Sequence, residues 1–136
     1  MSKRLLITLI GILCIGIVQA QNNVEEIAEK LAQEQLDAYN NRNIEAFLKP
    51  YADNVKVFNF PNEFQYEGKE NMRSRYQNMF ANSPDLHCNL VKRMVMGNTV
   101  IDQEEVIRKK GDPVFHAIAI YKIIEGKIAE VYFISK

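Results

Sequence analysis

The chain has 136 residues, the length of one domain, and an ordinary globular composition of 47% hydrophobic, 25% charged and 10% aromatic residues. Its 17 basic residues are balanced by 17 acidic ones, so it has no basic excess for binding nucleic acid. Two cysteines are too few for a disulfide scaffold, and no cysteine or histidine spacing resembles a zinc site, so we expect no metal and no other cofactor.

Residues 1–20 have the pattern of a secretory signal peptide. Two basic residues precede the apolar run Leu5–Val18, and Val18 and Ala20 occupy the two key positions of a cleavage site. The run is shorter than the roughly 20 residues of a membrane-spanning helix. We therefore expect cleavage after Ala20 and an exported domain, periplasmic or secreted, over residues 21–136. An uncleaved membrane anchor is the alternative.

Apolar residues at helical spacing predict three helices in the first part of that domain. The first begins at Asn22 or Asn23, either of which can cap it. The second covers Ile44–Tyr51 and the third covers approximately Lys69–Asn82. Gln35 lies on the apolar stripe of the first helix, so its side chain must find a polar partner or face a cavity.

Most of the remaining chain is predicted to form strands, because apolar residues alternate between turn sequences. The expected strands are Val55–Phe60, Phe64–Tyr66, Leu86–Met96, Thr99–Lys109, Val114–Ile124 and Lys127–Ile134. Helices that precede an antiparallel meander of strands indicate an α+β fold.

The segment Val114–Ile124 is apolar on both faces of its predicted strand. One face can pack against the helices, and it contains Phe115, Ala117, Ala119, Tyr121 and Ile123. Three helices cannot cover both faces of such a sheet, so the other face needs a different cover. A second copy of the protein is the simplest candidate, which predicts a homodimer through the outer sheet face.

Three segments resemble the nuclear transport factor 2-like superfamily. NIEAFLKPYADNV resembles its helix–helix–strand opening, YEGKENMRSRYQNMF its third helix, and HAIAIYKIIEGKIAEVYFI its last two strands. The most similar branch is the SnoaL-like, or steroid delta-isomerase-like, domains. The resemblance covers about residues 24–135. It implies a cone in which three N-terminal helices pack in a strongly curved, mostly antiparallel sheet, with a pocket at the wide end and dimers through the outer sheet face.

The resemblance does not extend to the catalytic groups of ketosteroid isomerases. Those enzymes use a carboxylate base and an oxyanion hole made of a tyrosine and a protonated carboxylic acid. The corresponding positions here are Asn59 for the base, Gln35 for the tyrosine and Ala119 for the acid. A supporting tyrosine of that family corresponds to Tyr76. The resemblance therefore implies the fold without this catalytic set, and no catalytic residue is assigned.

The same alignment implies a mostly apolar pocket with neutral polar groups. The expected lining is Gln35, Asn59, Tyr76, Ala119, Tyr121 and Phe133. Such a lining is typical of a site that binds a small, largely apolar molecule. In the alternative, these polar groups only satisfy one another inside the cone.

Four further residues decide between a binding domain and an enzyme. His87 and His116 are expected at the surface or at the dimer interface, and Asp102 and Glu104 in a solvated stripe along their strand. Asp102 and Glu104 share one face of that strand, so a pocket carboxylate stays open as a possibility. A carboxylate or imidazole in the pocket would favour an isomerase, cyclase or dehydratase acting on a carbonyl compound.

Overall fold

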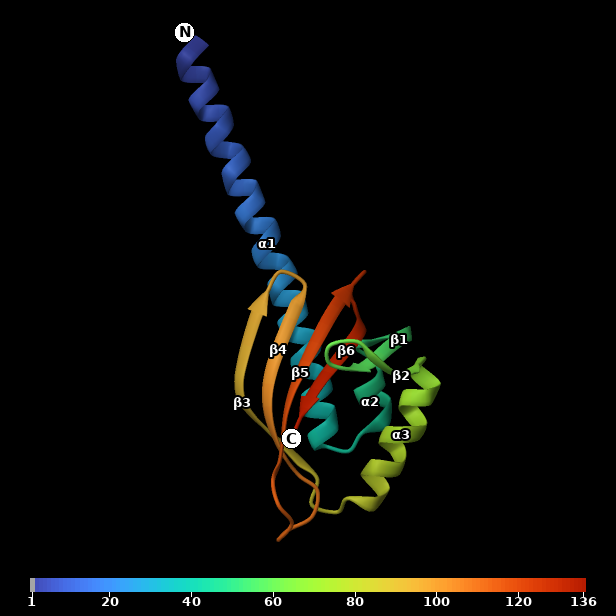
Figure 1. Ribbon diagram of the computed structural model, residues 1–136. Helices are drawn as coiled ribbons and strands as arrows, with labels where there is room; N and C mark the ends of the chain where they lie inside the picture. Colours follow the sequence, from blue (N-terminus) through green and yellow to red (C-terminus); the bar gives the residue numbers. More distant parts are fainter. Residues whose placement is uncertain (1) are drawn as a thin grey trace.

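The computed structural model describes residues 2–136, with side chains from Gln19 onward. Helix α1 (Ser2–Asn40) is continuous over 39 residues, and its first half extends away from the sheet (Figure 1). The predicted start at Asn22 or Asn23 is therefore wrong for the full chain, because no glycine or proline interrupts the helix there. The side chains of residues 1–18, which form most of the predicted signal peptide, lie outside the described part. Within that part, no helix is both long and apolar enough to cross a membrane.

Two shorter helices complete the helical layer. Helix α2 (Ile44–Leu48) begins at its cap Asn43, whose side chain accepts a hydrogen bond from the backbone N–H of Ala46 at 3.1 Å. Its predicted end at Tyr51 is wrong, because Pro50 has no N–H to continue the helix and Tyr51 begins the first strand. Helix α3 (Lys69–Asn82) has the predicted bounds.

Six strands form one curved, open sheet, which confirms the α+β prediction and the mostly antiparallel sheet. They are β1 (Tyr51–Asn59), β2 (Glu63–Glu67), β3 (His87–Met96), β4 (Thr99–Ile107), β5 (Phe115–Ile124) and β6 (Lys127–Ser135). Their order is β2-β1-β6-β5-β4-β3, and all neighbours are antiparallel except β1 and β6. The register shifts once within β3 and once at the end of β5, and such irregularities bend a sheet.

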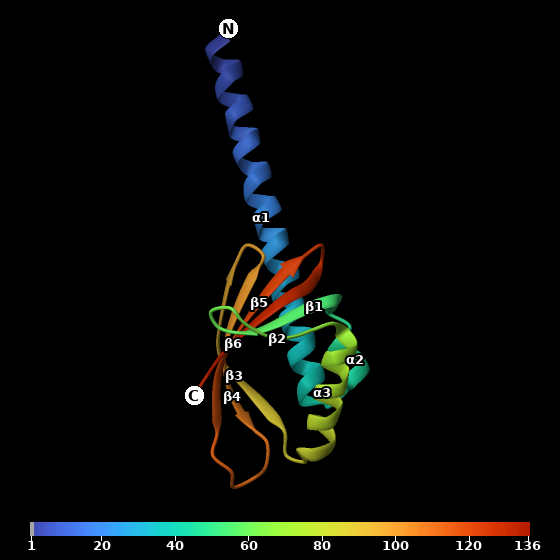
Figure 2. The same cartoon turned by 45° about the vertical axis from the view of Figure 1, so that its right-hand side comes forward.

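The concave face of the sheet holds the helices (Figure 2). Along β5, the side chains of Ala117, Ala119, Tyr121 and Ile123 are buried and those between them are more exposed, as the alternation predicted. Small residues on α1, Ala28 and Ala32, are fully buried in the same core, so the helix lies close to the strands.

The convex face of the sheet carries one apolar row across all six strands. Its members are paired in register, from strand to strand: Met94, Ile101, Ile120, Tyr132, Phe58 and Phe64. The two outermost side chains, Met94 and Phe64, are 53% and 56% exposed. No helix of the described chain covers this row.

Candidate functional site

A cavity of about 260 Å³ opens between the helices and the inner face of the sheet. Five of the six residues that the sequence predicted for a pocket contribute to its lining: Gln35, Asn59, Tyr76, Tyr121 and Phe133. They come from α1, β1, α3, β5 and β6, which are distant in sequence. Aromatic and aliphatic side chains form most of the remaining wall.

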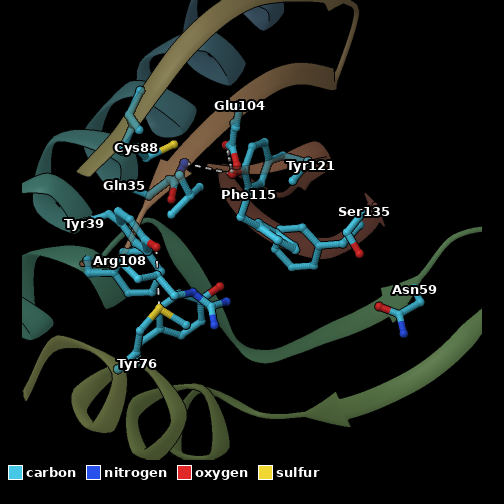
Figure 3. A pocket seen from close by; sticks show the side chains of 16 residues that line it. Gln35, Tyr39, Asn59, Tyr76, Cys88, Glu104, Arg108, Phe115, Tyr121 and Ser135 are labelled. Carbon is cyan, nitrogen blue, oxygen red and sulfur yellow. Dashed lines mark hydrogen bonds between the residues drawn. The ribbon is translucent and has the colours of Figure 1, made fainter. Parts of the chain in front are cut away.

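One of the six predicted residues lies elsewhere than expected. Ala119 is fully buried in the core and does not line the cavity, whereas Ala117, two residues earlier on the same face of β5, does. Asn59 lines the cavity but is exposed, at the end of β1, and Figure 3 shows it apart from Gln35, Glu104 and Tyr121. The three positions that correspond to the ketosteroid isomerase groups therefore do not form one cluster.

A chain of hydrogen bonds runs through the floor of the cavity. The Tyr51 hydroxyl donates to Gln35 Oε1 at 3.2 Å, and Gln35 Nε2 donates to the Tyr121 hydroxyl at 3.0 Å. The Tyr121 hydroxyl in turn donates to Glu104 Oε1 at 3.2 Å (Figure 3). Gln35 thus has polar partners on both sides, as its place on an apolar helix face required.

The carboxyl group of Glu104 overturns the expectation of a neutral lining. Its residue is 7% exposed and it lies on the cavity wall. The expected solvated stripe is wrong, because Asp102 and Glu104 lie on the same inward face of β4 as Val100 and Val106. The two valines on either side of the acids are compatible with this face, but Ile101 and Ile107 are apolar on the opposite face, so the sequence pattern did not distinguish the two.

The pKa of Glu104 is raised from its ordinary value of 4.5 to about 7. Burial is the largest cause of the rise, and the charge of the nearby Asp102 is the second. Hydrogen bonding from Tyr121, the charge of Arg93 and the Cys88 thiol oppose the rise. A carboxyl group that titrates near neutral pH can both accept and release a proton. Glu104 is therefore the group of this cavity best suited to acid–base chemistry.

Asp102 is fully buried but takes no part in the cavity lining. Its carboxylate receives two hydrogen bonds from Arg93, from Nε at 2.8 Å and from a terminal nitrogen at 2.7 Å. The other terminal nitrogen of Arg93 donates to Gln33 on α1 at 2.8 Å. This buried ion pair joins β3, β4 and α1 behind the floor of the cavity.

The remaining candidate nucleophiles and bases are unsuited to catalysis here. His87 and His116 are exposed and do not line the cavity, and His116 lies 3.8 Å from Glu105 on the convex face. Cys88 lines the cavity, but burial raises the pKa of its thiol, which disfavours the reactive thiolate. Within the described part of the chain, no three acidic, histidine or cysteine side chains group as a metal site.

Tyr76 lies on the wall of the cavity. Its ring packs on Phe47, with centroids 4.4 Å apart, and on Tyr39 at 6.2 Å. Burial raises its pKa well above 10, so it is a neutral donor at physiological pH.

The raised pKa of Glu104 predicts a pH-dependent stability. The folded state holds the proton more tightly than the unfolded state, so the free energy of unfolding falls as pH rises from 4.5 to about 7. The loss is roughly 3 kcal/mol. Glu104→Gln has no carboxyl group at this position and therefore lacks this pH-dependent loss. Its free energy of unfolding should rise relative to that of wild type as pH rises. Urea unfolding of both proteins from pH 5 to 8 measures the difference, and a difference that is constant with pH would contradict it.

Comparisons with known proteins agree with this architecture. The family model of the SnoaL-like domain matches residues 32–131. An uncharacterized cystatin fold protein from Novosphingobium aromaticivorans superposes with a TM-score of 0.71 and 26% identity, over 79% of this chain and 97% of that chain. No curated protein sequence matches the chain.

Two solved structures with lower identity share the fold. A putative ketosteroid isomerase from Kribbella flavida has a TM-score of 0.66 and 18% identity, over 82% of this chain and 79% of that chain. A putative SnoaL-like polyketide cyclase from Jannaschia has a TM-score of 0.69 and 12% identity, over 83% and 88%. At these identities the likeness concerns the fold alone.

Proposed function

Because the chain belongs to the SnoaL-like domain family of the nuclear transport factor 2-like superfamily, we propose that its cavity binds a small, largely apolar carbonyl compound and transfers a proton on it. One observation carries the proposal: Glu104 is a buried carboxyl group on the wall of a mostly apolar cavity, and its pKa is about 7. The sequence left this reaction class open as the alternative to binding alone.

The chemistry begins with ionised Glu104 as the base. It removes a proton from the carbon next to the carbonyl group, the C–H electron pair forms a carbon–carbon double bond, and the carbonyl oxygen becomes an enolate. Where the compound has a β,γ double bond, the product of this step is a dienolate. Protonated Glu104 then gives the proton to the γ-carbon, the double bond moves to the α,β position and the carbonyl group re-forms, which completes an isomerisation. The same first step can begin a cyclisation or a dehydration. Tyr76, a neutral tyrosine on the cavity wall, is the donor that we assign to the enolate oxygen.

Binding without catalysis is the second candidate. It is favoured by Gln35, Asn59 and Ala119, which stand where the ketosteroid isomerases carry their catalytic groups. A domain of this kind would use the same apolar cavity, with the tyrosine and glutamine hydrogen bonds fixing the orientation of its ligand. The two candidates differ only in what Glu104 does to the bound molecule.

Deuterium exchange distinguishes them. The protein is incubated in D₂O with bicyclic enones and aryl ketones, and proton NMR follows exchange at the carbon next to the carbonyl group. Exchange faster than in buffer alone supports proton transfer. Saturable binding without faster exchange supports the binding domain. If no compound of the panel either binds or exchanges, both candidates fail.

We also propose that the domain is exported and that cleavage follows Ala20. Among the side chains described, from Gln19 onward, those of Gln19–Asn23 are exposed and Ala28 is the first fully buried residue of α1. Glu25 accepts a hydrogen bond from the backbone N–H of Gly97, between β3 and β4, at 2.9 Å. These anchoring residues of α1 remain in the chain after cleavage at Ala20. The mass of the protein recovered from outside the cytoplasm tests this proposal.

We also propose a homodimer through the convex apolar row, because no helix of the described chain covers that row. Ile120→Glu places a charge in the middle of that row, so two copies would bury like charges against each other. We expect this variant to weaken dimerisation more than about a hundredfold, measured by light scattering over a concentration series. Gln77→Glu, at an exposed site on α3, is the matched control. A wild-type monomer, or a dimer equally stable in both variants, would contradict the prediction.

A further inference from the structure

The cavity has one charged group at each end. Among the described residues that line it, Glu104 is the one acid and Arg108 is the one base. Both project from the inward face of β4 and its continuation, four residues apart, with Val106 between them. Four residues of extended strand span roughly 13 Å. Glu104 is buried at the floor, whereas Arg108 is exposed at the opening.

The Arg108 guanidinium has no acidic partner in the described chain. It forms no ion pair there, unlike Arg73 and Arg93. Instead it lies over the ring of Phe115, with its central carbon 5.4 Å from the ring centroid. Stacking on a ring leaves the N–H groups at the edge of the guanidinium free to donate.

We propose that the ligand is an apolar carboxylic acid whose carboxylate binds Arg108 at the opening of the cavity and whose uncharged end reaches Glu104. This assignment rests on the proposed function and names the substrate class of the same site. Arginine binds a carboxylate through two parallel hydrogen bonds, and Phe115 supplies an apolar surface beside it.

The charges also fix the direction in which the ligand enters. The buried carboxyl group of Glu104 makes the floor unfavourable for an anion, because a second carboxylate beside it would add a like charge in a site shielded from water. A carboxylate therefore stays outside and its carbon skeleton points inward. The volume of about 260 Å³ is below the roughly 300–1,000 Å³ of sites for drug-sized ligands, so a compact acid of one or two rings fits this cavity.

A matched pair of probes tests the charge at Arg108. The probes are 6-hydroxynaphthalene-2-carboxylate and 6-hydroxynaphthalene-2-carboxamide, which share the ring and the hydroxyl group for the Glu104 end. We expect calorimetric titration of the full chain to give affinity about tenfold higher for the carboxylate. Arg108→Gln should remove that preference and leave the affinity for the amide unchanged. Added salt should weaken the binding of the carboxylate alone.

Arg75→Gln is the control variant. Like Arg108, Arg75 lies over an aromatic ring. Its central guanidinium carbon is 4.4 Å from the centroid of the Tyr66 ring, but Arg75 does not line the cavity. The variant has the same change of charge, and both probes should bind it as they bind wild type. Equal affinities of wild type for the two probes, or an equal loss of both in Arg108→Gln, would show that Arg108 is only a solvated residue. In that outcome amide binding preserves the proposed cavity function. Failure of both probes to bind overturns the assignment of an apolar carboxylic acid, and the ketone panel decides the proposed function separately.

Discussion

Glu104→Gln is expected to lower the rate of proton exchange on a bound ketone by about 10²- to 10⁴-fold. The amide has nearly the same size as the carboxyl group and can still accept the hydrogen bond from Tyr121, so the cavity keeps its shape. It cannot take a proton at neutral pH, however. Ligand affinity should therefore change little while exchange is lost, as NMR exchange rates and titration of the same ketone would show.

The neighbouring residue provides the control for this variant. Glu105→Gln makes the same chemical change on the opposite face of β4, where the carboxylate lies 3.8 Å from His116, and it should exchange at the wild-type rate. In wild type the rate should rise with pH and level off above about 7, as Glu104 ionises. If Glu104→Gln retained the wild-type rate, Glu104 would not be the base.

The largest loss of stability is expected for Arg93→Met. Removing the guanidinium leaves the fully buried carboxylate of Asp102 without both of its charged hydrogen-bond donors, and breaking a buried pair in this way costs about 3–5 kcal/mol. The variant also loses the bond to Gln33 that ties β3 to α1. Chemical denaturation followed by circular dichroism measures the change in the free energy of unfolding.

Two further variants separate the buried pair from charge loss in general. Arg73→Met breaks the exposed pair between Arg73 and Glu45 on α3 and α2, and it should cost less than about 1 kcal/mol. Adding Asp102→Leu to Arg93→Met removes the unpaired charge and should recover much of the stability. Equal losses for Arg93→Met and Arg73→Met would mean that burial of the pair is not the cause.

Local patterns in the sequence were sufficient for the elements and for part of the site. The spacing of apolar residues predicted α3 with approximately its observed bounds, and alternation along β5 identified its inward face. Gln35 was recognisable because a polar residue on an apolar helix stripe needs a partner, and Tyr51 and Tyr121 supply it. These properties depend on the near neighbours of a residue, which the sequence contains.

The tertiary structure decided which side of β4 faces the helices. Ile101 and Ile107 are apolar on one face of that strand, and Val100 and Val106 on the other, so the pattern permits either orientation. Only the pairing with β3 and β5 turns Asp102 and Glu104 inward. Asp102 then pairs with Arg93, and Glu104 lies on the cavity wall.

The same limit applies to individual pocket residues. Alternation correctly placed Ala119 on the inward face, but whether an inward residue is buried in the core or lines the cavity depends on how the helices pack over the sheet. The pKa of Glu104 depends likewise on burial by segments that are remote in sequence. The sequence by itself thus determined the elements and their apolar faces, because these follow from local periodicity. The cavity and its charged ends arise only when distant segments pack together.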